Sequence, residues 1–234
     1  MAQPMPPSYM AYDRTIVVFS PDGRLLQVEY AREMVKNGST SLGLKIKDGV
    51  LLGSVKTSPK LAVADSYRKT YIIDDHIGVV SAGSLADARE LVDMGRVKAQ
   101  VHRITYNEPI SVSSLTTSVC DRMHLVTQYA GVRPYGVGLL IGGVNDDGIK
   151  LFETEPSGTM IEWKAQAIGR GAEKAKKVLE KDFKDNMTKE EGMKVLLRAL
   201  QAGEKDATPE TSEVMHLTET AAIRIPDTEI KKAF

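Results

Sequence analysis

The sequence contains a single cysteine, Cys120, so no disulfide can form within the chain. It also lacks an excess of either charge, because 31 Lys and Arg balance 31 Asp and Glu. General nucleic-acid binders usually carry a basic excess, and the balance argues against that role. No apolar run approaches membrane-spanning length, and the start MAQPMPPSYMAYDR has no signal core. These absences predict a cytoplasmic protein in a reducing compartment.

The composition is that of an ordinary globular protein, with 42% hydrophobic and 26% charged residues. We expect one domain over residues 1–234. Residues 1–11 hold three prolines, three methionines and no periodic pattern, which predicts a mobile tail. The turn sequence SPDGR then leads into apolar residues at helical spacing, so residues 20–37 predict a turn and an N-terminal helix. Gly38 stands where a helix C-cap glycine belongs.

Residues 38–234 alternate between pairs of strands and pairs of helices. Asp48-Gly49 and Asp75-His76 predict two hairpins. The further segments, in order, are helices over about 84–105 and 111–129, strands VGLLIGGV, IKLFET and MIEWKA, helices from AEKAKKVLEKDF and TKEEGMKVLLRALQAG, and strands VMHLTE and AAIRI. Strands that are linked by hairpins argue against a doubly wound parallel sheet. They predict an α+β fold, a four-layer α-β-β-α sandwich of two antiparallel sheets.

A group of hydroxyls, Ser39, Thr40 and Ser41, follows Gly38 at the start of the first strand. A hydroxyl becomes a strong nucleophile when a base takes its proton, and a free N-terminal amine can be that base. Such chemistry would require cleavage after Gly38. The favoured interpretation is a strand that begins with small residues.

Another candidate is AIGRGAEKA, residues 167–175, where a strand gives way to a helix. Gly169 and Gly171 could cradle a phosphate, which would indicate a nucleotide-binding enzyme. The third glycine of the dinucleotide motif and the P-loop lysine are absent, so a tight turn is favoured. The four histidines have no metal-ligand spacing, and we predict neither a metal nor a cofactor.

A long stretch, YDRTIVVFSPDGRLLQVEYAREMVKNGSTSLG at 12–43, closely resembles the N-terminal signature of proteasome α subunits, above all those of archaea. RPYGVG at 133–138 and AIGRGAEKA resemble further α-subunit segments. The resemblance implies the N-terminal-nucleophile hydrolase fold with an extra N-terminal helix. It also implies a homo-heptameric α ring stacked on proteasome β subunits, which cut unfolded protein substrates with an N-terminal Thr. The α ring would be the gate in ATP-dependent intracellular protein degradation, without nucleic acid or membrane partners.

The resemblance assigns a gate to the N-terminal region. The tails, residues 1–11, would plug the axial pore. Tyr12, Asp13, Pro21 and Tyr30 match the cluster that holds the open gate in the family. Tyrosine supplies a rigid ring with a hydroxyl group, and the carboxylate of Asp13 can accept hydrogen bonds from a neighbouring chain.

The resemblance also assigns an activator site. A regulatory ATPase or another activator would insert its C-terminal tails between adjacent α subunits. Lys69 would meet the terminal carboxylate, although a solvated strand end is the alternative for this lysine. Gly38 would leave room for a backbone approach, and Glu29 and Arg32 would position the activator. Ser84 stands where relatives can carry Leu.

The resemblance implies a subunit that is no enzyme by itself within a threonine-type endopeptidase complex. In a gapless count from Ser39, the acidic partner of catalytic β subunits falls near Val55, and their catalytic lysine falls near Tyr71. Neither Val55 nor Tyr71 can act as the acid or the base. The alternative from another class is a self-processing N-terminal-nucleophile peptidase that uses Ser39. The central helices, 84–129, would face the β ring.

Overall fold

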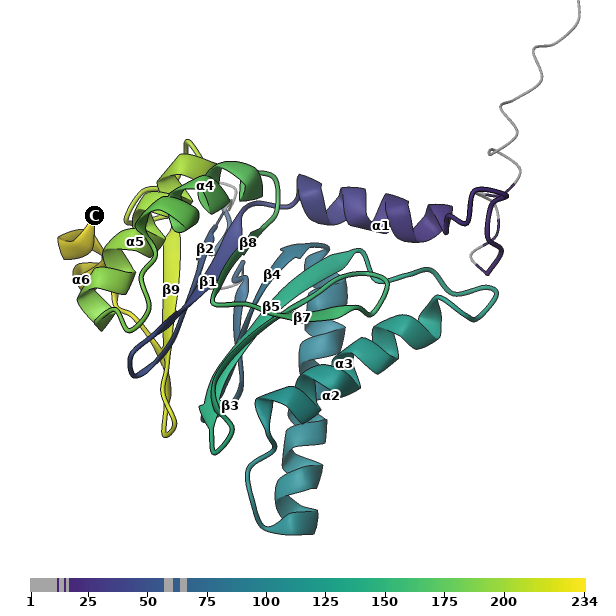
Figure 1. The fold of residues 1–234 in the computed structure, drawn as a ribbon, viewed down its shortest axis with the longest axis horizontal. Coiled ribbons are helices and arrows are strands. Elements are labelled where there is room, and N and C mark those ends of the chain that lie inside the picture. Colours follow the sequence, from purple (N-terminus) through teal and green to yellow (C-terminus); the bar gives the residue numbers. More distant parts are fainter. Residues whose placement is uncertain (1–11, 13–14, 16, 57–60, 64–66) are drawn as a thin grey trace, which may run out of the picture.

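Two antiparallel sheets of five strands each form the middle of the molecule in a computed structural model that describes residues 12, 15, 17–56, 61–63 and 67–234 (Figure 1). The first sheet has the order β10-β9-β2-β1-β8, and the second has the order β3-β4-β5-β6-β7. The strands of the first are β1 (Ser41–Ile46), β2 (Gly49–Val55), β8 (Ala165–Ile168), β9 (Ser212–Leu217) and β10 (Ala222–Arg224). Those of the second are β3 (Thr70–Asp74), β4 (Ile77–Gly83), β5 (Val137–Asn145), β6 (Gly148–Thr154) and β7 (Met160–Glu162).

Helix pairs cover the outer faces of the sheets. The pair α4 (Ala172–Asp182) and α5 (Lys189–Gly203) packs on the first sheet, and α2 (Leu85–Tyr106) and α3 (Val112–Val126) pack on the second. A third apolar cluster lies between the sheets and includes Leu52, Leu140 and Met215. The predicted four-layer sandwich is therefore confirmed.

The helix α1 (Leu26–Asn37) lies across one end of the sandwich and contacts β4 and β5 (Figure 1). Leu26, Val28 and Ala31 are its buried residues, which matches the predicted apolar spacing. The predicted tail, residues 1–11, and Asp13 lie outside the described residues. Within the described part of the chain, no helix combines the length and the apolar composition needed to cross a membrane.

Two elements differ from the predictions. The segment MIEWKA is not one strand, because β7 ends at Glu162 and β8 begins at Ala165 in the other sheet. Between them, the Trp163 amide donates to the Leu151 carbonyl, and the Lys164 carbonyl accepts from the Lys45 amide. These two residues therefore carry the chain from one sheet to the other. The short helix α6 (Asp227–Ala233), which was not predicted, buries Ile230 and packs against α5.

Candidate functional site

Lys69 and Ser39 form the centre of the candidate site, at the end of the sandwich that carries α1. Lys69 directly precedes β3, and only 4% of its surface is exposed. Its Nζ donates to the Ser39 carbonyl oxygen at 2.5 Å and to Ser39 Oγ at 2.8 Å. The solvated-strand-end alternative for Lys69 is therefore wrong.

Ser39 itself is buried two residues before β1, so the prediction that it begins a strand is wrong. Its Oγ donates to the carbonyl oxygen of Val55 at 3.0 Å. The gapless count from Ser39 therefore predicted the position of Val55 correctly. It placed the lysine at Tyr71, two residues after Lys69. The lysine that contacts Ser39 is Lys69, and Tyr71 lies half-buried in β3.

The ammonium group of Lys69 has no carboxylate partner among the described residues. Glu204 is engaged by Arg170, whose Nη2 lies 2.8 Å from Oε2, and by the amide and hydroxyl of Thr40. Glu213 pairs with Lys56 at 3.6 Å. Burial lowers the pKa of Lys69 to about 7, because desolvation outweighs the more distant attraction of the two carboxylates.

Gly38 joins α1 to this site and is the C-cap of the helix, as predicted, with its amide donating to the Val35 carbonyl at 3.0 Å. Its φ of −65° and ψ of 150° are extended, so this cap is not the left-handed form that glycine often adopts. A Cβ added at Gly38 would lie 2.2 Å from the amide nitrogen of Gly83 at the end of β4. A glycine is therefore required here by the close approach of two backbone segments of the same chain.

The turn AIGRG, residues 167–171, packs against the segment that contains Gly38 and Thr40. The Arg170 amide donates to the Gly38 carbonyl at 2.8 Å, and the Gly171 amide donates to Thr40 Oγ1 at 3.0 Å. The donors that could have cradled a phosphate thus bind the chain itself, which supports the tight-turn interpretation. Glu204 was missed from the sequence, because it follows α5 with no pattern that pairs it with Arg170.

The other residues that the resemblance assigns to an activator site lie around α1. Glu29 accepts hydrogen bonds from Arg24, and Arg32 donates to Glu155 at 2.8 and 3.0 Å. Both are therefore engaged within this chain. Ser84 caps α2 by accepting from the Asp87 amide, directly after the Gly83 backbone that meets Gly38.

Ser84, together with Tyr30, which the resemblance assigns to the gate, lines one cavity of about 340 Å³ between α1 and the start of α2. Its other lining residues are Gln27, Ala31, Met34, Asp87, Arg133, Pro134 and Gly136. Pro21 lies exposed in the turn before α1, where the Gly23 amide donates to the Ser20 carbonyl. Tyr12 is half-buried.

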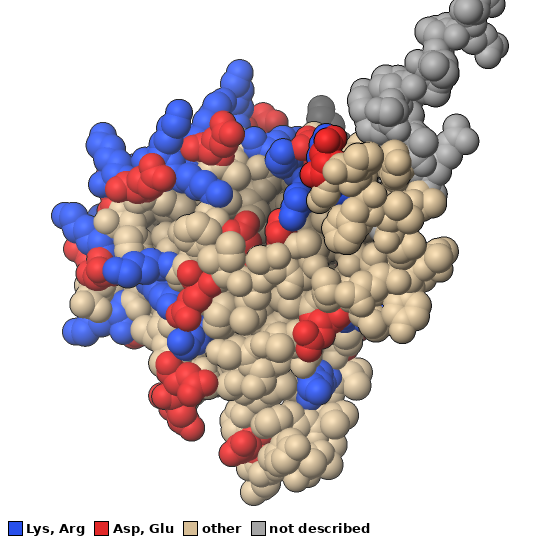
Figure 2. Space-filling view, turned by 45° about the vertical axis from the view of Figure 1, so that its right-hand side comes forward, with Lys and Arg blue, Asp and Glu red and all other residues tan. Residues whose placement is uncertain are grey.

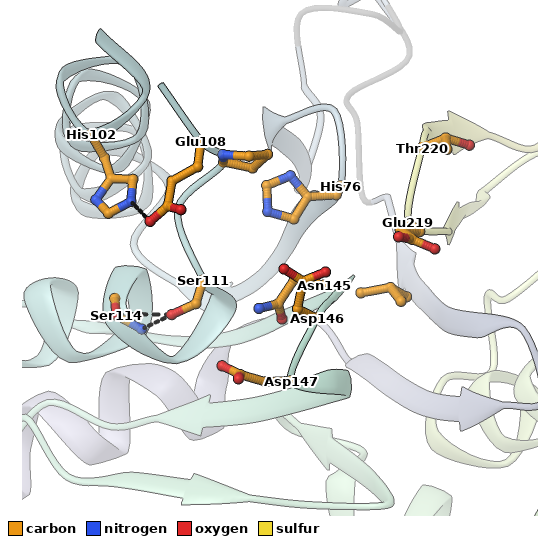
Figure 3. A pocket seen from close by; sticks show the side chains of 12 residues that line it. His76, His102, Glu108, Ser111, Ser114, Asn145, Asp146, Asp147, Glu219 and Thr220 are labelled. Carbon is orange, nitrogen blue, oxygen red and sulfur yellow. Dashed lines mark hydrogen bonds and ion pairs between the residues drawn. The ribbon is translucent and has the colours of Figure 1, made fainter. Parts of the chain in front are cut away.

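A second cavity, of about 430 Å³, lies where the C-terminal end of α2, the start of α3 and the β5–β6 turn meet (Figure 3). Its lining includes His76, His102, Glu108, Asp146 and Asp147. His76 Nε2 lies 2.9 Å from the Ile110 carbonyl oxygen, so this histidine helps to anchor the start of α3. The described residues hold no group of three or more His, Cys, Asp or Glu side chains suited to a metal ion.

Charged side chains are distributed unevenly over the surface. Figure 2 shows Lys, Arg, Asp and Glu gathered over one side of the molecule, while a broad neighbouring area carries few of them. The exposed apolar side chains include Tyr30 and Met34 on α1, and Val97, Val101 and Ile104 on α2. A run with helical spacing on α2 is therefore left without an apolar partner within the described chain.

Two packed antiparallel sheets lie between helix layers, and Ser39 before β1 contacts Lys69 before β3. This arrangement is consistent with the N-terminal-nucleophile hydrolase fold. A family model described as "Proteasome subunit" matches residues 35–217, and a model for the N-terminal signature of the A-type proteasome subunits matches residues 12–33. The chain belongs to the proteasome subunit family and is of the α type.

Archaeal relatives agree with this assignment. The chain is 49% identical over 224 residues to the proteasome alpha subunit of Methanothermobacter thermautotrophicus, covering 94% of this chain and 90% of the relative. It is 46% identical over 230 residues to that of Methanopyrus kandleri, covering 97% and 94% of the two chains. It is also 46% identical over 233 residues to that of Methanocaldococcus jannaschii, covering 98% and 88%.

The contact between Gly38 and Gly83 predicts a strong effect of Gly38→Ala. The new methyl group must push α1 away from β4, so we expect a destabilisation of about 1–3 kcal/mol. The measurement is urea unfolding of the purified chain. Gly131→Ala is the matched control, because an added Cβ there meets nothing within 4 Å. The positive φ at Gly131 alone should make Gly131→Ala lower the free energy of unfolding by about 1 kcal/mol. A smaller loss of stability for Gly38→Ala than for this control would contradict the packing argument.

Glu204 predicts a pH-dependent contribution to stability. Burial disfavours its charged form, but hydrogen bonds from Arg170 and Thr40 outweigh burial and hold the pKa of Glu204 below its usual value of 4.5. The carboxylate therefore stabilises the fold above about pH 4.5, and this contribution is lost as the pH falls further. Glu204→Gln should lower the free energy of unfolding at pH 7, and the difference from the unaltered chain should shrink below pH 4.5. The exposed Glu180→Gln is the control, and a difference that stays constant with pH would rule out this role of the charge.

Proposed function

We propose that this chain is the non-catalytic subunit that forms the outer ring of an archaeal-type proteasome core, gates entry to it and docks the C-terminal tails of an activator. The observation that carries the proposal is the buried ammonium group of Lys69, which has no carboxylate partner among the described residues. A buried cation of this kind is strongly stabilised by an arriving anion. The terminal carboxylate of an activator tail supplies that anion. Degradation in the cytoplasm, driven by an ATPase, is the role that follows.

The environment of Ser39 supports the absence of catalysis. Its nitrogen is in the peptide bond to Gly38, whose carbonyl is held by the Arg170 amide, so Ser39 has no free amine as a base. Its hydroxyl donates to the carbonyl of Val55, where the resemblance implies an acidic side chain in the catalytic relatives. The Ser39 hydroxyl therefore acts as a structural donor.

The exposed apolar surface supports assembly into rings. Ile104, 84% exposed on α2, lies in a row with Val97 and Val101. We propose that the α2–α3 side faces the β ring and that α1 packs within a homo-heptameric α ring. Tyr30, 49% exposed on α1, then lies where it can contact a neighbouring chain. With Tyr12, Asp13 and Pro21, Tyr30 would hold the open arrangement of the gate, and residues 1–11 would close the pore.

Lys69→Met tests the docking role, because methionine is unbranched and only one atom shorter than lysine, and it removes the charge. Reconstituted with β subunits, the variant should assemble and retain basal peptide hydrolysis, but activator-stimulated hydrolysis should fall at least tenfold. Lys164→Met is the matched control, since Lys164 is exposed and pairs with Asp185 at 2.9 Å. Normal stimulation of the assembled Lys69→Met particle would refute carboxylate docking at this lysine.

Deletion of residues 2–11 tests the gate. If these residues close the pore, the complete particle should hydrolyse small peptides severalfold faster in the absence of an activator. The rate of free β-subunit assemblies on the same peptide provides the reference for an open chamber. An unchanged basal rate would count against a plugging role of the tail.

A second candidate function, a self-processing peptidase, is favoured by one observation. Ser39 Oγ lies 2.8 Å from Lys69 Nζ, and the pKa of Lys69 is about 7, so a neutral lysine could accept the hydroxyl proton. The mass of the chain in the assembled particle separates the two functions. Chains that retain residues 12–38 support the gating function, and chains that begin at Ser39 would support the peptidase.

A further inference from the structure

The charged groups that face Lys69 leave its ammonium uncompensated. Glu204 after α5 and Glu213 on β9 attract it, whereas Arg170 between β8 and α4 repels it. The two carboxylates are already paired, Glu204 with Arg170 and Glu213 with Lys56. The direct partners of Nζ among the described residues are the two oxygens of Ser39, which carry no charge.

The geometry points to a proton-linked docking site. We propose that a carboxylate-ended tail binds at Lys69 together with one proton, so that activator binding strengthens as the pH falls through neutrality. This inference rests on the proposed function and adds to it the form of regulation.

The linkage follows from the two states of the lysine. In the unoccupied site, the pKa of Lys69 is about 7, so the amine is increasingly neutral above that pH. A carboxylate at hydrogen-bond distance from Nζ favours the ammonium form and raises its pKa. Binding above pH 7 must therefore take up a proton, and the association constant should fall by about tenfold per pH unit. Well below pH 7 the lysine is already charged, and binding should be independent of pH.

The pH range of the effect differs from that of an ordinary surface lysine. An exposed lysine stays charged to about pH 10, so its affinity for a carboxylate does not change between pH 6 and 8.5. The burial of Lys69 between β3 and the segment before β1 lowers its pKa, so the amine loses its charge within the neutral pH range. The proposed pH dependence is thus a consequence of packing in the fold.

Calorimetry on the assembled particle tests the inference. The probe is a peptide with the C-terminal sequence of an archaeal regulatory ATPase, used with a free carboxylate and as the C-terminal amide. Titrations at pH 6, 7 and 8.5, each in two buffers of different ionisation enthalpy, give the affinity and the number of protons taken up. We expect uptake to rise from near zero at pH 6 to about one at pH 8.5, with affinity falling about tenfold or more.

The outcomes separate the two claims. Binding that requires the free carboxylate but takes up no proton at any pH overturns the linkage and leaves the docking function intact. Binding of the amide with equal affinity, or no binding of either peptide, overturns docking at Lys69 and the linkage with it.

Lys69→Arg assigns the proton to this residue. Arginine stays charged over the whole range, so peptide affinity for this variant should not change between pH 6 and 8.5. An unchanged pH dependence in Lys69→Arg would place the proton elsewhere and overturn the inference. If the variant does not bind, proton uptake by the unaltered particle decides the question.

Discussion

The burial of Lys69 against Ser39 is the constraint that the rest of the site depends on. The contact joins the start of β3, in one sheet, to the segment that enters β1, in the other. Thr40 extends the connection through Glu204 to Arg170, and so to α5 and the turn before α4. Elements from both halves of the sandwich therefore meet at three consecutive residues, Gly38, Ser39 and Thr40.

The same junction explains how α1 belongs to the fold. α1 packs mainly on β4 and β5, and its C-terminal end is held where Gly38 meets the backbone of Gly83. The junction thus keeps an amphipathic helix of 12 residues at the end of the sandwich, with Tyr30 and Met34 exposed. In the described chain, α1 and Gly38 directly precede the hydroxyl of Ser39, which is the arrangement that the proposed docking and gating require.

Much of the architecture could be predicted because it depends on local spacing. Asp48-Gly49 marks a tight hairpin wherever it lies between alternating apolar residues, and the 25–37 segment has a helical apolar stripe. The break at Trp163 could not be predicted, because the change of sheet depends on the carbonyl of Leu151 and the amide of Lys45. The helix α6 is short and polar, and it is stabilised by packing on α5.

The sequence by itself determined the order and type of most elements and the relationship to proteasome α subunits, since local periodicity and a long contiguous signature carry both. Only the tertiary structure decided what Lys69 and Gly38 do. The first lies 30 residues from the hydroxyl it contacts, so its burial and lowered pKa arise from chain segments that meet only in the folded state. Position 38 requires glycine because the backbone at the end of β4 approaches it closely, and no local pattern around residue 38 reveals that approach.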